Sequence, residues 1–129
     1  MAYSEKIQNL RVLIVEDNVS FREMLREKLQ ALSASTIIDE AGNGSEALQK
    51  VEALKPELVF MDIHLPGENG IQLTQKIRES YPNTKIIILT SHDSLEYREA
   101  AMRSGGSGYI SKDSLHYIQI EALVKSIVE

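Results

Sequence analysis

The sequence predicts an α/β domain in which a five-stranded parallel sheet carries helices on both faces. Short, largely apolar segments alternate five times with segments of helical periodicity, which indicates repeated strand–helix units. The strands are largely apolar, as is typical of parallel strands that helices bury on both sides. A length of 129 residues fits one domain, so we expect residues 1–129 to form a single unit with its core over about 10–128.

The first two units are clearly patterned. The first strand is predicted over residues 11–15, where four apolar residues follow Arg11. The helix after it has one apolar face, formed by Phe21, Met24, Leu25, Leu29 and Leu32. A second strand over residues 35–41 leads through Gly42-Asn43-Gly44 into a helix whose apolar face is Ala47, Leu48, Val51 and Leu54. Pro56 ends this helix, because proline has no N–H to donate and clashes with the preceding turn.

Three further units complete the sheet. The third strand is predicted over residues 58–61, and Pro66-Gly67 breaks the chain before a helix with Ile71, Thr74 and Ile77 on one face. The fourth strand, over residues 85–89, is apolar from its second residue and is expected to be buried on both faces. A weaker helix over residues 94–104 ends at Gly105-Gly106 and precedes a short strand over 109–111. The apolar face of the last helix is Ile120, Leu123, Val124 and Ile127.

Composition excludes several classes of protein. The chain has no cysteine, which rules out a disulfide framework, a zinc–thiolate site and an iron–sulfur cluster. Its apolar runs are far shorter than the roughly 18 residues of a membrane span, and its first residues lack the apolar stretch of a secretory signal. We therefore expect a cytoplasmic protein without membrane contact. A net charge of −5 also argues against direct nucleic-acid binding by this domain.

Polar residues stand where the predicted strands end. In sheets of this kind, ligands bind outside the carboxyl ends of the strands. The residues that follow the first, third, fourth and fifth strands are Glu16, Asp17, Asp62, Thr90, Ser91 and Lys112. We therefore expect them to meet at one edge of the sheet.

Three carboxylates at one edge require a compensating charge. At separations of about 5 Å each pair repels by roughly 3 kcal/mol at an effective dielectric constant near 20. Mg²⁺ is the natural compensating ion because it prefers carboxylate and water oxygens, and Lys112 adds a positive charge. A carboxylate beside Mg²⁺, a lysine and a hydroxyl suits phosphoryl transfer, which depends on positioning and charge neutralisation. Asp62 is the expected nucleophile, with Lys112 and Thr90 holding phosphoryl oxygens.

Four segments in register give the chain a family resemblance. They are Val12-Leu13-Ile14-Val15-Glu16-Asp17, Met61-Asp62-Ile63-His64-Leu65-Pro66-Gly67, Ile88-Leu89-Thr90-Ser91 and Gly108-Tyr109-Ile110-Ser111-Lys112. In order and spacing they resemble the receiver domain of two-component response regulators, over roughly residues 10–128. The resemblance implies a flavodoxin-like (βα)5 fold with strand order 2-1-3-4-5.

The resemblance implies a role for each site residue. Asp62 resembles the phosphoacceptor, Lys112 the phosphoryl-binding lysine and Thr90 the switch hydroxyl. Tyr109 resembles the aromatic switch residue whose ring moves inward. The implied Mg²⁺ ligands are Glu16, mainly through water, Asp17, Asp62 and the backbone carbonyl of His64. Many family members carry Met or Asp where this chain has His64, so only the carbonyl role of this residue carries over unchanged.

The resemblance also implies partners. A sensor histidine kinase donates the phosphoryl group, and the domain catalyses its own phosphorylation and dephosphorylation but is otherwise not an enzyme. Phosphorylation is expected to change the face formed by residues 94–129, which in the family binds a target protein, an attached output domain or a second copy. Segment 108–113 is similar to receivers attached to DNA-binding domains of the NarL/LuxR type. The chain ends directly after its last predicted helix, so a stand-alone receiver and the receiver part of a longer transcription regulator both stay open.

Two other functions stay open at this point. A Mg²⁺-dependent hydrolase of small phosphates would also use a strand-end aspartate, although Asp62-Ile63-His64 does not match the Asp-x-Asp signature of haloacid-dehalogenase-type phosphatases. A nucleotide-binding module is suggested by Gly42-x-Gly44-x-x-Ala47, which follows a strand and opens a helix. This motif lies on the second unit instead of the first. Its alternative explanation is a turn in which Asn43 or Ser45 caps the helix.

Side chains near the acceptor are further candidates. His64, Ser91 and His92 lie close in sequence to the acceptor and the switch hydroxyl, so we expect them to modulate the lifetime of the phosphorylated state. Histidine titrates near neutral pH, and a pH dependence would follow. Taken alone, each site residue also has a structural explanation, such as a helix start for Glu16-Asp17.

Overall fold

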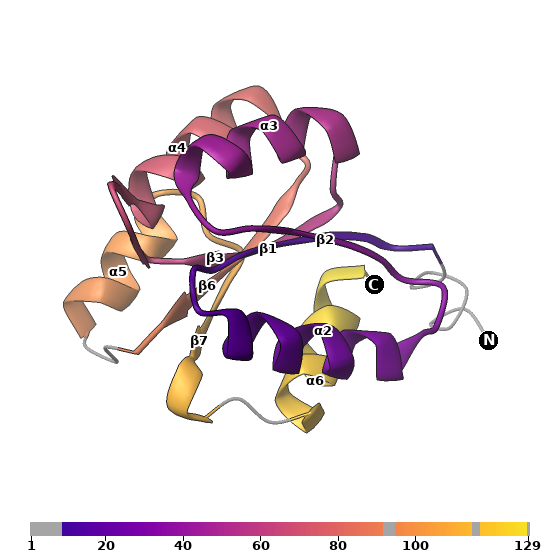
Figure 1. The fold of residues 1–129 in the computed structure, drawn as a ribbon. Coiled ribbons are helices and arrows are strands. Elements are labelled where there is room, and N and C mark those ends of the chain that lie inside the picture. Colours follow the sequence, from indigo (N-terminus) through magenta and orange to yellow (C-terminus); the bar gives the residue numbers. More distant parts are fainter. Residues whose placement is uncertain (1–8, 92–94, 115–116, 129) are drawn as a thin grey trace.

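The computed structural model confirms the predicted architecture and describes residues 9–91, 95–114 and 117–128 (Figure 1). Five parallel strands form one sheet in the order β2-β1-β3-β6-β7. Their bounds are β1 (Arg11–Val15), β2 (Ile37–Ala41), β3 (Leu58–Asp62), β6 (Lys85–Thr90) and β7 (Gly108–Ser111). Counted along these five strands, this is the predicted order 2-1-3-4-5.

Helices cover both faces of the sheet, with α2 and α6 on one side and α3, α4 and α5 on the other (Figure 1). Their bounds are α2 (Val19–Leu32), α3 (Gly44–Leu54), α4 (Gly70–Ser80), α5 (Leu95–Arg103) and α6 (Tyr117–Val128). None of these described helices combines the length and the hydropathy that a bilayer crossing requires. Ser94, the predicted first residue of α5, lies outside the described residues.

The described core falls into two clusters because successive strand residues point to opposite faces. On β1, Val12 and Ile14 belong to the cluster under α2 and α6, whereas Leu13 and Val15 belong to the cluster under α3, α4 and α5. All four are fully buried. Strands buried on both faces explain why the sequence shows continuous apolar runs instead of alternation.

Side-chain caps and backbone turns set the ends of the elements. The Asn18 side chain accepts the N–H of Phe21, and α2 begins at Val19, two residues before the first residue of its predicted apolar face. Asn43 caps α3 in the same way, and Lys55 (φ 50°) ends that helix just before Pro56. Strand β2 begins at residue 37 instead of 35, since Ser35 takes part in a serine-rich turn that its hydroxyl helps to close.

Two features were not predicted, the short 3-10 helix η1 (Lys112–Ser114) and a hairpin. The break at Pro66-Gly67 is the tip of a short antiparallel hairpin between β4 (His64–Leu65) and β5 (Glu68–Asn69). Gly67 has a φ of 76°, a conformation that costs a residue with a Cβ atom about 1–2 kcal/mol. The hairpin follows Asp62 directly, so it carries the chain away from the carboxyl edge of the sheet and into α4.

Candidate functional site

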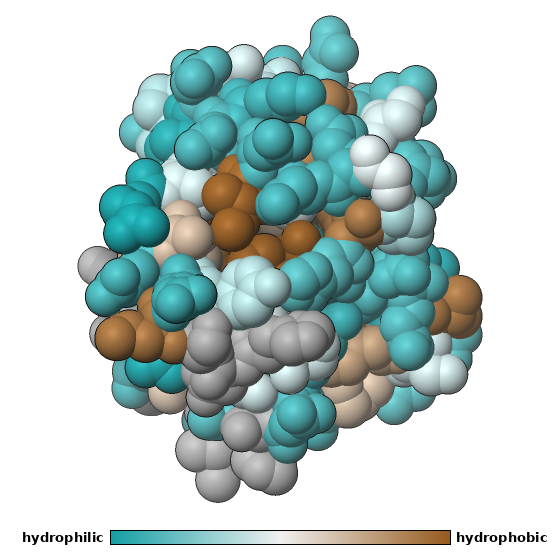
Figure 2. Space-filling model, turned by 90° about the vertical axis from the view of Figure 1, so that its left-hand side faces the viewer, coloured by the Kyte–Doolittle hydropathy of each residue, from teal (hydrophilic) through white to brown (hydrophobic). Residues whose placement is uncertain are grey.

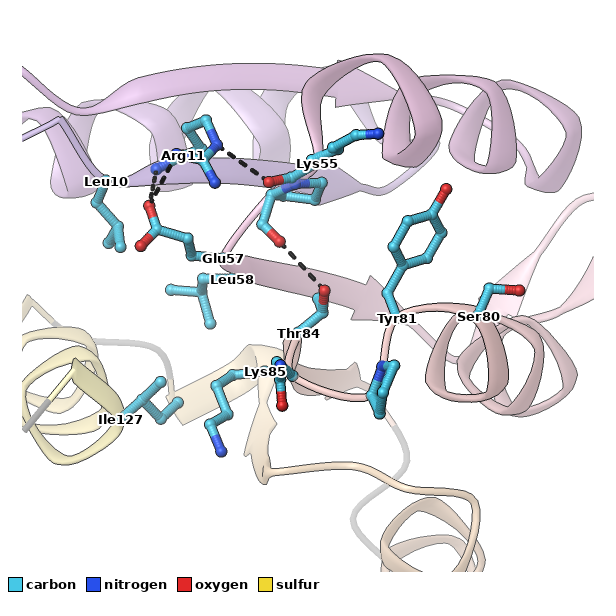
Figure 3. Close-up of a pocket in the computed structure, with 13 residues that line it drawn as sticks. Leu10, Arg11, Lys55, Glu57, Leu58, Ser80, Tyr81, Thr84, Lys85 and Ile127 are labelled. Carbon is cyan, nitrogen blue, oxygen red and sulfur yellow. Dashed lines mark hydrogen bonds and ion pairs between the residues drawn. The ribbon is translucent and has the colours of Figure 1, made fainter.

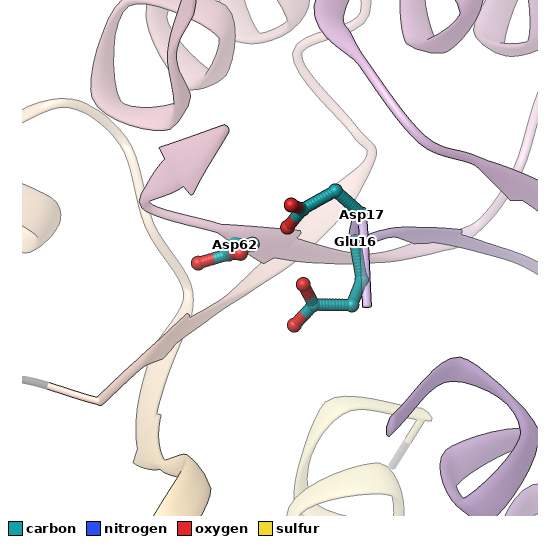
Figure 4. A group of neighbouring side chains, drawn as sticks. All are labelled: Glu16, Asp17 and Asp62. Carbon is teal, nitrogen blue, oxygen red and sulfur yellow. The ribbon is translucent and has the colours of Figure 1, made fainter. Parts of the chain in front are cut away.

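The predicted acidic residues converge at the carboxyl edge of the sheet. Glu16 and Asp17 follow β1, and Asp62 is the last residue of β3, the strand next to β1. Carboxylate oxygens of the three residues all lie within 4.8 Å of one another. Figure 4 shows the three carboxylates pointing toward a common space.

Strand register explains why three of the side chains share one face. Glu16, Asp62 and Lys112 each stand two positions after a core residue, and side chains two apart in a strand point the same way. Those core residues all belong to the cluster under α2 and α6; they are Ile14, Phe60 and Ile110. The charged site is therefore a continuation of that face beyond the ends of the strands.

Lys112 bridges the two buried carboxylates. Its Nζ lies 3.1 Å from Asp62 Oδ2 and makes an ion pair with Glu16 Oε1. Glu16 is fully buried and Asp62 is 2% exposed, whereas Asp17 is exposed to solvent. The second oxygen of each buried carboxylate accepts a backbone N–H, from Asn18 for Glu16 and from His64 for Asp62, both at 3.1 Å.

The lysine is positively charged at neutral pH. Burial lowers the pKa of Lys112, but the hydrogen bond to Glu16 and the charge of Asp62 outweigh burial, and the pKa lies above its ordinary value. One ammonium does not balance the three clustered carboxylates, so the site retains an excess of negative charge.

The donor set of this site fits a hard divalent cation. Mg²⁺ binds oxygen ligands, uses one or two carboxylates and keeps several of its waters. Two buried carboxylates beside the exposed Asp17 provide oxygen donors with an open side toward solvent. The residues present thus fit the expected ion, while the backbone carbonyl of His64 stays a predicted ligand.

The two predicted switch residues lie on adjacent strands. In the β6–β7 ladder Thr90 pairs with Ser111 and Ile88 pairs with Tyr109, so the side chains of Thr90 and Tyr109 project from the same face. This face is the one covered by α3, α4 and α5, opposite to the face that carries the charged site. Thr90 is fully buried and Tyr109 is half-buried.

The remaining candidates lie around the site. His64 is exposed, and its ring meets the ring of Tyr97 edge-on, with centroids 5.4 Å apart. Ser91 is exposed just after β6, and His92 lies outside the described residues. The modulating role of the His64, Ser91 and His92 side chains stays a prediction.

Sequence reasoning missed three side chains that contact the site. Tyr97 contacts His64, and the Arg98 guanidinium lies 5.1 Å from the ring centroid of Tyr109. The ring centroid of Phe21, predicted only as a core position of α2, lies 5.1 Å from the Nζ of Lys112. These contacts join residues far apart in the sequence, and no spacing rule indicates them.

The glycine motif at the start of α3 does not form a nucleotide site. The Glu68 carboxylate occupies the space beside Gly44, since a Cβ atom on Gly44 would lie 2.1 Å from Glu68 Oε2. A carboxylate at this helix start repels the pyrophosphate that a dinucleotide would place there. The structure instead supports the turn-and-cap explanation, because Asn43 Oδ1 accepts the N–H of Glu46 at 2.9 Å.

A separate hollow of about 700 Å³ lies at the opposite edge of the sheet, beside the amino ends of β1, β3 and β6 (Figure 3). Arg11, at its rim, donates from Nε to the carbonyl of Lys55 and pairs with Glu57. The amino groups of Lys55 and Lys85 point away from each other in Figure 3. The positive charges of this hollow do not converge, unlike the carboxylates of the acidic site.

Comparison with known proteins decides the family. The family model of the response regulator receiver domain matches residues 12–127. The chain belongs to the response regulator receiver domain family. This receiver domain is 38% identical over 106 residues to the oxygen regulatory protein NreC of Staphylococcus carnosus, covering 81% of the chain and 49% of NreC. It is 35% identical over 114 residues to the transcriptional regulatory protein YxjL of Bacillus subtilis, covering 88% of the chain and 52% of YxjL.

Solved structures of response regulators share the fold of this receiver domain. A LuxR-family two-component response regulator from Aurantimonas sp. SI85-9A1 matches with a TM-score of 0.86 and 28% identity, covering 94% of this chain and 86% of that one. A CheY-like receiver domain protein from Methanospirillum hungatei matches with a TM-score of 0.84 and 26% identity, covering 92% and 93%. The flavodoxin-like fold and the NarL/LuxR-type resemblance are thereby confirmed. The chain spans about half the length of the curated relatives it matches.

Proposed function

We propose that this receiver domain is a signalling switch in which Asp62 accepts a phosphoryl group. The observation that carries the proposal is the Asp62 carboxylate, 2% exposed and 3.1 Å from the Lys112 ammonium, inside a cluster of three carboxylates. Glu16, Asp17 and Asp62 would hold Mg²⁺. When bound, Mg²⁺ supplies positive charge that offsets the charge on the phosphoryl oxygens.

The proposed step is a displacement at phosphorus. A carboxylate oxygen of Asp62 attacks the phosphorus atom, the bond from phosphorus to the donor breaks, and its electron pair leaves with the donor group. Lys112 exchanges its contact with Asp62 for one with a phosphoryl oxygen, and the Thr90 hydroxyl donates to another. Attack of water on the acyl phosphate reverses the modification. In this proposal the domain itself catalyses both reactions. No other enzymatic activity is proposed.

The proposed output is a change in the face formed by residues 94–129. Phosphorylation adds about −1.5 to −2 charges and three acceptor oxygens, which Thr90 and Tyr109 would follow. Tyr109 is half-buried against the core cluster under α3, α4 and α5, and Arg98 lies 5.1 Å from its ring centroid, so a movement of the ring would change both contacts. A hollow of about 300 Å³ between β7 and α6 is lined by Tyr109 and Leu123, which supports a partner contact on this face.

The partners form part of the proposal. A sensor histidine kinase would approach the carboxyl edge, where apolar side chains show in a hollow among polar residues (Figure 2). Val19 and Leu95, at the starts of α2 and α5, are 54% and 68% exposed and suit such a contact. A DNA-binding output domain, a separate target protein or a second copy would read the 94–129 face.

The remaining parts of the proposal rest on family membership. Residues 1–129 would act as one receiver domain with its core over about 10–128, in the cytoplasm. No direct nucleic-acid or membrane contact by the domain is proposed.

A mass measurement tests this function. The protein is incubated with acetyl phosphate and Mg²⁺, and its intact mass is compared with that of Asp62→Asn and of a sample in EDTA. We expect one added phosphoryl group in the wild type and none in either control. Turnover of acetyl phosphate by Asp62→Asn at the wild-type rate would instead favour a hydrolase that does not use a covalent intermediate on Asp62.

A further inference from the structure

The ring of Phe21 lies beside the lysine of the acidic site. Phe21 stands in the first turn of α2, on the face of the sheet that carries Glu16, Asp62 and Lys112. Lys112 Nζ lies over this ring, 5.1 Å from its centroid. A cation within about 6 Å of a ring centroid is attracted by the negative face of the aromatic ring.

Among the described residues, three side chains surround the Lys112 ammonium. A lysine ammonium has three N–H donors. In the part of the chain that the structure describes, its contacts are the carboxylates of Glu16 and Asp62 and the ring of Phe21. The Lys112 side chain is 18% exposed, and the Phe21 ring is one of the groups that cover its ammonium.

The same capping residue positions the ring and one carboxylate. The N–H of Asn18 donates to Glu16 Oε2 at 3.1 Å, and Asn18 Oδ1 accepts the N–H of Phe21 at 2.9 Å. Glu16 binds Lys112 through its other oxygen, and Lys112 lies over Phe21. These contacts form a closed loop of four residues, in which the start of α2 sets the place of the lysine.

We propose that Phe21 is a positioning residue for phosphoryl transfer, whose ring holds the Lys112 ammonium while Asp62 changes from carboxylate to acyl phosphate. This inference rests on the function proposed above. In that step Lys112 must leave one oxygen of Asp62 for an oxygen of the phosphoryl group. Attraction to a ring face does not require one N–H direction, so the ammonium can turn toward its new partner without losing this contact.

The first test needs no phosphorylation. Protons above the face of an aromatic ring resonate upfield, so the ε-methylene protons of Lys112 should be shifted upfield of those of exposed lysines. The measurement is a ¹H–¹³C spectrum of protein with labelled lysine, in which Lys112→Arg identifies the signal. In Phe21→Leu, which keeps an apolar side chain for the core, this signal should return to the ordinary lysine position. An unchanged signal would overturn the proposed contact.

The second test separates the charge effect of the ring from its packing. Mono-, di- and trifluorinated phenylalanine is placed at Phe21, because fluorine weakens the negative ring face at nearly constant shape. The phosphorylation rate with acetyl phosphate should fall stepwise, by about three- to tenfold for the trifluorinated ring. The matched control is the same series at Phe60, the chain's other phenylalanine, which is fully buried in β3.

The outcomes separate the two proposals. Normal wild-type phosphorylation with equal rates across the Phe21 series would overturn the positioning role and leave the proposed function intact. Wild-type protein that gains no phosphoryl group would contradict the proposed function, and the lysine spectrum would then decide the Phe21 contact alone. Equal rate losses in the Phe60 series would show that fluorine acts through packing and would also overturn the positioning role.

Discussion

Glu40 of the edge strand β2 binds Arg22, which in turn binds the backbone carbonyl of Glu16. Arg22 donates from Nε to Glu40 Oε1 at 2.9 Å and from Nη1 to the carbonyl of Glu16 at 2.7 Å. Arg26 donates to the other oxygen of Glu40 from Nε at 2.8 Å. One carboxylate thus orients the arginine that fixes the backbone of Glu16, a predicted metal ligand.

This contact predicts an acid-dependent stability. Burial raises the pKa of Glu40, but the hydrogen bonds and charges of Arg26 and Arg22 outweigh burial and hold it below its ordinary value. A carboxyl group with a depressed folded pKa stabilises the protein above its unfolded pKa and loses this contribution as the pH falls through the folded pKa. Below about pH 4.3, the usual pKa of glutamate, the wild type should lose stability more steeply than Glu40→Gln.

Urea unfolding at a series of pH values measures this difference. The exposed Glu52 provides the control, because Glu52→Gln should follow the wild-type profile. If the free energy of unfolding fell in parallel with pH for wild type and Glu40→Gln, the predicted contribution of Glu40 to acid-dependent stability would be contradicted.

At the scale of elements, the β4–β5 hairpin holds the strand end that carries Asp62. The N–H of Gly70 donates to the carbonyl of Ile63 at 3.1 Å, and the Glu68 carboxylate sits against Gly44 and pairs with Lys76. The hairpin therefore connects the site to the starts of both α3 and α4.

Two glycines of this segment should respond differently to alanine. A Cβ atom on Gly70 would lie 2.1 Å from the carbonyl oxygen of Asp62, whereas no atom lies within 4 Å of a Cβ atom on Gly67. We expect Gly70→Ala to lower the free energy of unfolding by about 3 kcal/mol and to slow phosphorylation, because backbone atoms must shift. Gly67→Ala should cost about 1 kcal/mol through its positive φ and leave the phosphorylation rate unchanged.

Denaturant unfolding and acetyl phosphate kinetics on the two variants check this prediction. If Gly70→Ala lost no more unfolding free energy than Gly67→Ala and kept the wild-type phosphorylation rate, the close approach at Gly70 would not position Asp62.

The strands were predictable from the sequence, whereas the hairpin and one contact between elements were not. Short, largely apolar segments predicted the five strands, and the family resemblance implied their order. The positions of Glu16, Asp62 and Lys112 after those strands predicted that they would meet. The hairpin was missed because two-residue strands are too short for any periodicity. The Phe21–Lys112 contact was missed because it depends on how α2 and the end of β7 pack across the sheet, which no local pattern records.

For the whole molecule, the sheet separates the charged site from the two predicted switch residues. Glu16, Asp62 and Lys112 continue the α2–α6 face, and the predicted switch residues Thr90 and Tyr109 lie on the opposite face. In the proposed switch, a signal would pass from one side to the other at the carboxyl ends of β3, β6 and β7, which are hydrogen-bonded neighbours. Coupling of about 1–3 kcal/mol is typical of such two-site systems.

Metal binding should therefore stabilise the whole fold. At a Mg²⁺ concentration 100 times the dissociation constant, a site present only in the folded state adds about 2.7 kcal/mol to the free energy of unfolding. Asp17→Asn should lose most of this increment, and it should raise the melting temperature in EDTA because it removes one of three repelling carboxylates. Thermal unfolding with and without Mg²⁺ measures both effects.

The matched control is Glu23→Gln, an exposed acidic residue of α2. It should keep the full Mg²⁺ increment. An increment that survives Asp17→Asn would place the ion elsewhere.

The identity of the modified residue shows whether Asp62 is the phosphoacceptor. Protein phosphorylated with acetyl phosphate and Mg²⁺ is reduced with borohydride, which converts an acyl phosphate to an alcohol, and its peptides are mapped by mass spectrometry. We expect homoserine at position 62, absent when EDTA removes the metal. Homoserine at another acidic residue, such as Asp17, or labelling that persists in EDTA would contradict it.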